Sequence, residues 1–155
     1  MFTVEEHWFR NLDQELITLI KELQKDTTFN KNWPNFKIVS AWRPNKTKDK
    51  PDWYIEKGRQ SQEELWNQKN KPYQVAKFSA HNVNPACAFD FDSGSGRSNH
   101  AACWADISKI AKSKNIKTTA TYPKGDPVHV QLSKYSRGSV SSSTLAALSS
   151  FDDVD

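Results

Sequence analysis

Apolar side chains recur at helical spacing at the start of the chain. Thr3-Val4-Glu5-Glu6 fits a capping box, in which the threonine hydroxyl and the glutamate carboxylate satisfy free backbone amides at a helix start. The apolar positions that repeat every three or four residues are Val4, Trp8, Phe9, Leu12, Leu16, Leu19, Ile20 and Leu23. This pattern predicts one helix over about residues 3–25 with a single buried stripe.

Two later segments alternate between apolar and polar residues, as half-buried strands do. In residues 86–92 (ACAFDFD) the two phenylalanines point to one side, and Asp90 and Asp92 point to the other. In residues 127–132 (PVHVQL) His129 shares the polar face with a glutamine. Both segments therefore predict strands that each present one polar face.

The rest of the chain mixes helices, strands and loops. Residues 36–42 (FKIVSAW) and 116–122 predict further strands. Residues 60–69 and 100–114 predict helices, whereas the polar, proline- and lysine-containing stretch 44–58 predicts a long surface loop. Because helices and short strands alternate without a parallel βαβ rhythm, the expected fold class is α+β.

Composition refines the domain organisation. The chain has 155 residues, of which 36% are hydrophobic, and eight serines fall within residues 133–155. We expect one domain over residues 1–132, which is rich in aromatic residues, and a polar, flexible tail over 133–155. This composition excludes collagen, a coiled-coil rod and a wholly disordered chain.

Cysteine content and the N-terminus bear on the compartment. Cys87 and Cys103 do not make a disulfide framework, so we expect reduced thiols. No apolar run approaches the ~20 residues that span a bilayer. The N-terminus lacks the basic start and the unbroken apolar stretch of a secretory signal. We therefore expect a monomer without a membrane span, made in the cytoplasm without a signal peptide.

The net charge of +4 is compatible with an anionic partner, such as nucleic acid, an anionic lipid surface or a cell-wall polymer. One hypothesis is accordingly a non-catalytic, basic, tryptophan-rich module that binds cell-wall glycan or nucleic acid. Its supporting residues lie in the expected surface loop: Lys46, Lys48, Lys50, Trp53 and Tyr54. Such a module binds in a salt-sensitive manner.

Candidate chemistry is concentrated in a few histidines and aspartates. The sequence contains no P-loop and no GxGxxG, CxxC, HExxH or GxSxG motif. His81 precedes the strand that carries Asp90 and Asp92, and His129 lies on the last predicted strand, three residues after Asp126. Two histidines and one aspartate make a facial zinc set, and a further carboxylate can serve as general base.

The order of these residues resembles a known family. The segment SAHNVNPACAFDFD, followed 36 residues after Asp90 by DPVHVQL, is similar to the zinc D,D-peptidase and phage endolysin family of peptidoglycan peptidases. That family's pattern is Ser-x-His, Ala-x-Asp, a helix containing Trp, and then Asp/Glu-x-x-His. The matching positions are Ser79, His81, Ala88, Asp90, Trp104, Asp126 and His129.

Two upstream pieces extend the resemblance to about residues 36–132. Ser40-Ala41-Trp42-Arg43 resembles a strand ending in Ser-Gly-Tyr-Arg, and Gln62, Leu65 and Trp66 match a Gln-x-x-Leu-aromatic helix. The sequence departs from the pattern in the separation of His81 from Asp90, which is nine residues instead of seven. This leaves Asp92, on the same strand face, as an alternative ligand.

The resemblance implies a hedgehog/D,D-peptidase-like fold, a single α+β domain with a small antiparallel sheet flanked by helices. It implies that His81, Asp90 and His129 bind Zn²⁺. It also implies that Asp126 is the general base and that Arg43 stabilises the oxyanion or holds a substrate carboxylate. Ser79 and Gln62 would contribute to substrate binding, and Gln131 would orient the ligands of the last strand.

The implied activity is hydrolysis of peptide bonds in peptidoglycan stem peptides. An aspartate at position 126 resembles the L-alanyl-D-glutamate endopeptidases of phage endolysins. The expected partner is the peptidoglycan peptide and not nucleic acid, and the expected place of action is the bacterial cell wall, after release or phage delivery. The binding module described above is the second hypothesis, and a metal nuclease is the third.

Overall fold

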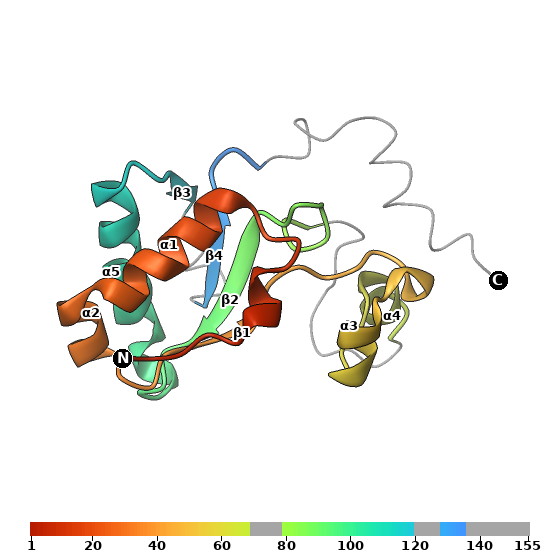
Figure 1. Cartoon of the computed structure of the whole chain (residues 1–155), viewed down its shortest axis with the longest axis horizontal. Helices are drawn as coiled ribbons and strands as arrows, with labels where there is room; N and C mark the ends of the chain where they lie inside the picture. The colour runs from red at the N-terminus through yellow and green to blue at the C-terminus, as the bar shows by residue number, and fades with distance from the viewer. Residues whose placement is uncertain (69–78, 120–127, 136–155) are drawn as a thin grey trace.

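A computed structural model describes residues 1–68, 79–119 and 128–135, which form a mixed helix and strand structure around a four-stranded antiparallel sheet (Figure 1). The strands are β1 (Lys37–Ser40), β2 (Ala88–Asp92), β3 (Thr118–Thr119) and β4 (His129–Leu132), joined in the order β1-β2-β4-β3. The longer helices are α1 (Gln14–Lys25), α2 (Thr27–Asn32) and α5 (His100–Ser113). The α+β fold class is therefore confirmed.

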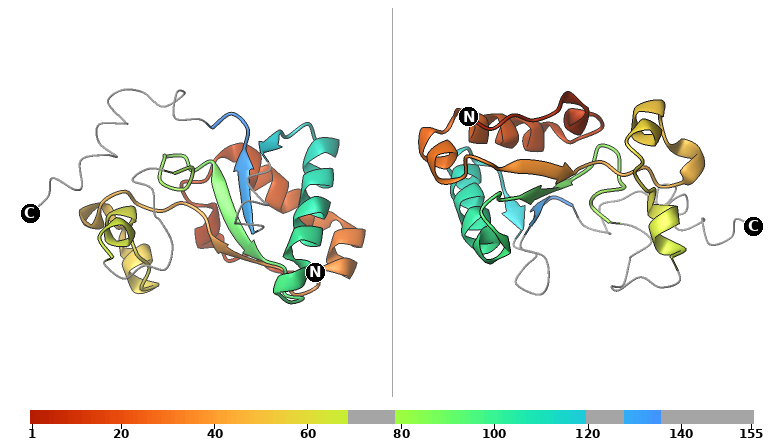
Figure 2. Two further views of the ribbon diagram at one scale, coloured as in Figure 1. Left: turned by 180° about the vertical axis from the view of Figure 1, so that it is seen from behind. Right: turned by 90° about the horizontal axis from the view of Figure 1, so that it is seen from below.

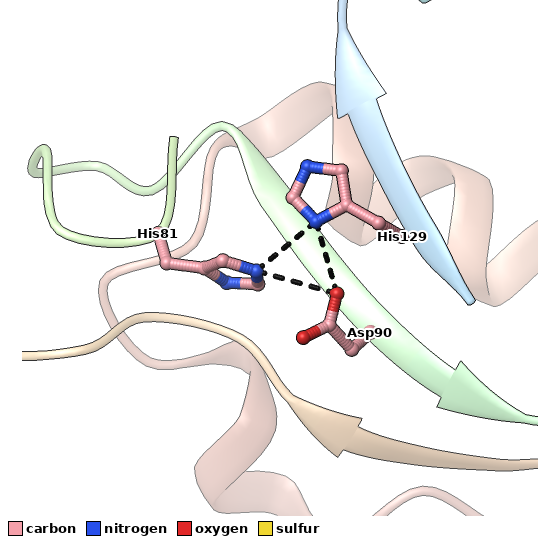
Figure 3. A group of neighbouring side chains, drawn as sticks. All are labelled: His81, Asp90 and His129. Atoms are coloured by element: carbon pink, nitrogen blue, oxygen red, sulfur yellow. Dashed lines mark hydrogen bonds and ion pairs between the residues drawn. The ribbon is translucent and has the colours of Figure 1, made fainter. Parts of the chain in front are cut away.

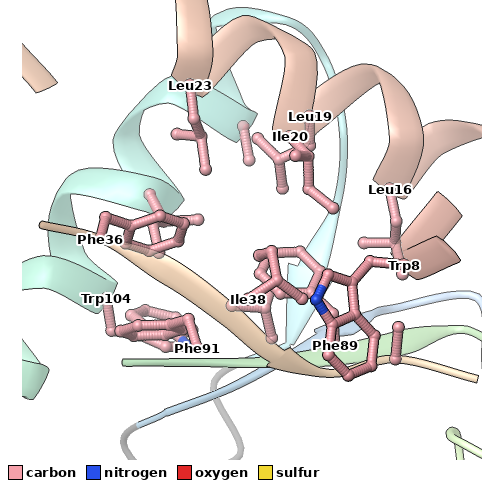
Figure 4. Packing of buried hydrophobic residues seen from close by; sticks show 14 of the residues in the cluster. Trp8, Leu16, Leu19, Ile20, Leu23, Phe36, Ile38, Phe89, Phe91 and Trp104 are labelled. Carbon is pink, nitrogen blue, oxygen red and sulfur yellow. The ribbon is translucent and has the colours of Figure 1, made fainter. Parts of the chain in front are cut away.

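The two central strands, β2 and β4, have one apolar and one polar face. Phe89 and Phe91 are buried in the core, together with apolar residues of α1 and α5 (Figure 4). Asp90 and His129 are partly exposed on the opposite face. The core cluster draws on residues from Phe2 to Leu132, so the apolar face joins distant parts of the chain.

The prediction of one continuous helix over residues 3–25 is wrong. A 3₁₀ helix, η1 (Glu6–Phe9), is followed by a break, and α1 starts only at Gln14. Asn11 adopts the left-handed conformation (φ 57°), which asparagine tolerates better than most residues. Asp13 caps α1 by accepting a hydrogen bond from the Glu15 amide at 2.9 Å.

The break has a tertiary cause. Residues next to it hydrogen bond to the segment before β2, with the Ala86 amide donating to the Asn11 carbonyl (2.7 Å) and the Asp13 amide donating to the Ala86 carbonyl (2.9 Å). A helix through this region would use these backbone groups within itself. Pairing with Ala86 and capping by Asp13 replace that helix, and the capping box expected at Thr3 does not form.

The predicted surface loop over residues 44–58 is also more structured than expected. It contains η2 (Thr47–Asp49) and α3 (Asp52–Glu56), and α4 (Gln62–Trp66) follows with a capping box between Ser61 and Glu64. The Tyr54 side chain is buried and its hydroxyl donates to the Gln60 carbonyl at 2.7 Å. Figure 2 shows α3 and α4 together beyond one end of the sheet.

Cation–π and ion-pair contacts hold this helical pair to the N-terminal segment. The Arg59 guanidinium lies 4.8 Å from the centre of the Trp8 ring, and the Arg10 guanidinium lies 5.6 Å from the Trp53 ring. Lys57 pairs with Glu5 at 3.2 Å. The prolines and lysines of the segment did not indicate this packing, since Pro44 is buried and the Lys50 side chain is only 13% exposed.

The remaining predictions agree with the described elements. The helix expected over 100–114 is α5, preceded by η3 (Arg97–Asn99), and the strands expected at 36–42, 86–92 and 127–132 are β1, β2 and β4. The strand expected over 116–122 is described only in part, as β3, because residues 120–127 lie outside the described residues. Most of the expected polar tail, residues 136–155, also lies outside them.

The turn after β2 depends on a glycine and gives a test of the fold. Gly94 has φ +76°, and a Cβ atom there would overlap the Asn35 carbonyl group. Gly58 has a similar φ of +65° but faces open space. We expect Gly58→Ala to cost about 1–2 kcal/mol of unfolding free energy for its backbone conformation alone. Gly94→Ala should cost about 2–5 kcal/mol, because overpacking adds to the backbone cost.

Urea unfolding of the two variants beside the wild type measures both costs. Equal losses at Gly94 and Gly58 would contradict the close approach of the turn to Asn35.

Candidate metal centre

Three side-chain atoms from separate parts of the chain converge on the polar face of the sheet (Figure 3). Asp90 on β2 and His129 on β4 are direct register partners, so their side chains lie on the same face. The Asp90 Oδ1 atom lies 3.0 Å from His129 Nδ1 and 3.3 Å from His81 Nε2. The two histidine nitrogens lie 3.2 Å apart.

The long separation of His81 from Asp90 is absorbed by a closed loop. The Cys87 amide donates to the Ala80 carbonyl at 2.8 Å, so the chain returns beside its starting point just before β2 begins. The nine residues from His81 to Asp90 are therefore spanned by this loop, and Asp90 still lies beside the two histidines. The loop is fixed further by the pairing of Ala86 with the break before α1.

Asp90 is the aspartate that the structure groups with the histidines. Asp92, the alternative ligand, also points to the polar face, but its Oδ1 atom accepts a hydrogen bond from the Gly94 amide at 2.8 Å. It thereby stabilises the turn after β2. The described geometry favours Asp90 over Asp92 as the carboxylate of the three-residue group.

The His81 ring is oriented by a backbone carbonyl. His81 Nδ1 lies 2.8 Å from the Ala41 oxygen, and because a carbonyl can only accept, Nδ1 carries the proton. In a neutral ring, Nε2 then directs its lone pair at Asp90 Oδ1. A lone pair that faces a carboxylate is repelled by it unless a proton or a metal ion lies between the two.

The charge of Asp90 depends on its histidine neighbours. Burial disfavours ionisation, but when both rings carry their second proton, the positive charge of His81 and hydrogen bonds from His129 and His81 outweigh the effect of burial and hold the pKa of the Asp90 carboxyl well below its usual range. The carboxylate is thus ready to interact with a cation. Its side chain is 18% exposed and that of His129 is 14% exposed, so the group is accessible from one side.

The spacing of the three atoms suits a small, tetrahedrally coordinated metal ion. Bonds of about 2.0–2.1 Å in a tetrahedron place neighbouring ligand atoms about 3.3 Å apart. The three separations here are 3.0, 3.2 and 3.3 Å. His81, Asp90 and His129 together could therefore hold a metal ion with two nitrogen ligands and one oxygen ligand.

Arg43 is bonded to the loop that carries His81 through its backbone, and Gln62 contacts the Arg43 side chain. The Arg43 amide donates to the His81 carbonyl at 2.9 Å, which ties the end of β1 to the loop that carries the histidine. The Arg43 Nη1 atom donates to Gln62 Oε1 at 2.7 Å. Because the Gln62 side chain is buried, its visible role is to hold the guanidinium in place.

Ser79 shapes the turn that presents His81. Its hydroxyl oxygen accepts from the His81 amide at 3.1 Å, and its backbone amide donates to Asn82 Oδ1 at 2.6 Å. Asn82 is buried and in turn donates to Asn45 Oδ1 at 3.2 Å. Asp126, the expected general base, lies outside the described residues.

Two supports of the site were not predicted from the sequence. Trp104 is buried in the core and also donates from Nε1 to the His129 carbonyl at 2.9 Å. Its position in the family pattern could have indicated a role near the ligands. The Ala41 carbonyl that orients His81 gives no signal in the sequence, because any residue at that position has the same backbone group.

No protein-family model matches the sequence, and a comparison with curated proteins finds no significant match. Among residues 1–68, 79–119 and 128–135, every helix is too short or too polar to cross a membrane.

The two aspartates of β2 provide a direct test of the metal centre. We expect the wild-type protein to bind one zinc ion and Asp90→Asn to bind it more than about 100-fold more weakly, since even changes behind the ligands cost 10–100-fold. Asp92→Asn removes an equal charge from the same strand face and should retain metal affinity.

Competition with a chromophoric chelator gives the affinities, and unfolding curves show whether each variant is folded. Strong binding by Asp90→Asn together with loss of binding by Asp92→Asn would make Asp92 the ligand.

Proposed function

We propose that this protein is a zinc metallopeptidase that hydrolyses peptide bonds in peptidoglycan stem peptides. The observation that carries the proposal is the convergence of His81 Nε2, Asp90 Oδ1 and His129 Nδ1 at separations of 3.0–3.3 Å on an accessible face of the sheet. The order of these residues along the chain supports the reaction class through the family resemblance.

The donor set favours zinc among the common metal ions. Imidazole nitrogens suit zinc and other late transition metals, whereas magnesium and calcium take mainly oxygen ligands. Three protein ligands are typical of catalytic zinc sites, in which the fourth position takes water or substrate. When bound, zinc supplies a Lewis acid and lowers the pKa of its water to about 7.

The chain's own residues would supply charge stabilisation and proton transfer. Arg43 is held beside the His81 loop by its backbone and by Gln62, and its guanidinium can hold a carboxylate or a developing oxyanion. Asp126 lies three residues before His129 in the sequence, and we propose that it takes the proton of the attacking water and passes it to the leaving amine.

The substrate class rests on the resemblance. The pattern that matches this chain is that of peptidoglycan peptidases, and an aspartate in place of glutamate at position 126 favours an endopeptidase over a carboxypeptidase. A net charge of +4 is compatible with the anionic bacterial cell wall. We therefore propose the cell wall as the place of action.

The binding-module hypothesis receives less support from the packing of its aromatic residues. Trp8, Trp33 and Trp104 are buried in the core. The rings of Trp42 and Trp53 lie 6.3 Å apart, where they pack against each other. Base or sugar stacking requires an exposed ring face, which these core tryptophans do not offer.

Cleavage of purified muropeptides tests the proposed activity. We expect zinc-loaded wild-type protein to release peptide fragments that mass spectrometry identifies. Asp126→Ala should lower kcat by about 10²–10⁴-fold, the usual contribution of a general base, while zinc content stays the same. Asp92→Asn serves as a matched control that should retain cleavage.

Cleavage that survives in Asp126→Ala, or a wild-type protein without metal affinity, would overturn the proposal. Salt-sensitive binding to glycan or nucleic acid that is indifferent to a chelator would favour the binding module instead. Magnesium-dependent nicking of plasmid DNA would favour a nuclease.

A further inference from the structure

We propose that Gln131 is a positioning residue that fixes both the orientation and the proton of the His129 ring, so that Nδ1 is available as a metal ligand. The inference rests on the metal-binding part of the proposed function. It starts from one contact, in which Gln131 Oε1 lies 2.9 Å from His129 Nε2, on the side of the ring away from Asp90.

The two histidines offer opposite ring nitrogens to the centre. His81 reaches in from a loop and offers Nε2, the nitrogen far from its backbone. His129 lies directly opposite Asp90 on the neighbouring strand and offers Nδ1, the nitrogen close to its backbone. Each ring has its other nitrogen next to an oxygen outside the centre, from the Ala41 carbonyl or the Gln131 amide.

One hydrogen bond to Gln131 settles two properties of the His129 ring. A half turn about the Cβ–Cγ bond exchanges Nδ1 with Cδ2 and Nε2 with Cε1. The turned ring would therefore lose the Gln131 contact and would present carbon to Asp90. Acceptance by Gln131 Oε1 also places the proton on Nε2, which leaves a lone pair on Nδ1.

The backbone around Gln131 is well placed for this role. Gln131 pairs with Ala88 on β2 and with Thr119 on β3, so its strand is held on both sides. Trp104, on α5, donates a hydrogen bond from its indole nitrogen to the carbonyl of His129 and so holds this part of β4 in place. The ring and its acceptor therefore project from one rigid strand, two residues apart on the same face.

The acceptor is also neutral. The side-chain amide of Gln131 and the carbonyl of Ala41 orient the rings without adding charge, so Asp90 is the single carboxylate of the three-residue group. A carboxylate at position 131 would accept the same hydrogen bond and make the imidazole a more basic ligand. We therefore expect a protein with glutamate at position 131 to bind metal at least as tightly as the wild type with glutamine. A protein with leucine at this position should bind metal more weakly than both.

Zinc and cobalt affinities of full-length variants test this order. We expect Gln131→Leu, which keeps the size of the side chain but removes the acceptor, to weaken binding about 10–100-fold. Gln131→Glu should rescue affinity to at least the wild-type value. Thr119→Val, at the register partner of Gln131 on β3, controls for disturbance of the sheet and should leave affinity unchanged.

Nitrogen-15 NMR of the His129 ring gives a readout that does not depend on metal. In the metal-free wild-type protein at alkaline pH, where the ring is neutral, we expect the proton on Nε2. This measurement decides the inference even where Gln131→Leu fails to fold. A proton on Nδ1 would overturn it, because the ring would then donate to Asp90 and Gln131 would present its NH₂ group.

The outcomes separate the inference from the proposed function. Wild-type protein that binds no metal would overturn the proposed zinc peptidase. Wild-type protein that binds metal, with equal affinity in a folded Gln131→Leu variant, would overturn only the role of Gln131.

Discussion

The antiparallel pairing of β2 with β4 is the constraint on which both the core and the candidate metal centre depend. Its register sets Asp90 opposite His129 and Phe89 opposite Val130. Because side chains alternate between faces, a shift of one residue would bury the polar pair and expose the apolar one. Hydrophobic burial of Phe89 therefore also selects the register that brings the two candidate ligands together.

The sequence predicted side-chain positions best where these depend on a single strand or helix. Alternation in residues 86–92 correctly predicted which side chains of β2 face the core, and with it the common face of Asp90 and Asp92. It could not choose between these aspartates, since the choice depends on contacts with His81 and with Gly94 from other segments. The three residues of the candidate metal centre were thus predictable as a set, but their detailed contacts were not.

Predictions failed where distant backbone groups compete with local preference. The apolar stripe of residues 3–25 is real, since Trp8, Leu12 and Leu16 are all buried. Periodicity does not reveal that Ala86 takes hydrogen bonds that a continuous helix would need. The same holds for the Ala41 carbonyl, whose effect on His81 arises only after β1 and the loop lie side by side.

The loop closed between Ala80 and Cys87 means that the distance in space between His81 and Asp90 does not depend on the number of residues between them. Within such a loop, insertions and deletions change the chain length between two ligands without moving either of them. The length of this interval can therefore change without displacing the ligands only where the closing hydrogen bond, the backbone contacts of Ala86 and the strand register all persist. The number of residues between the histidine and the aspartate is accordingly a poor criterion for recognising distant homologues of such a site. A better criterion is that the aspartate and the second histidine lie on paired strands.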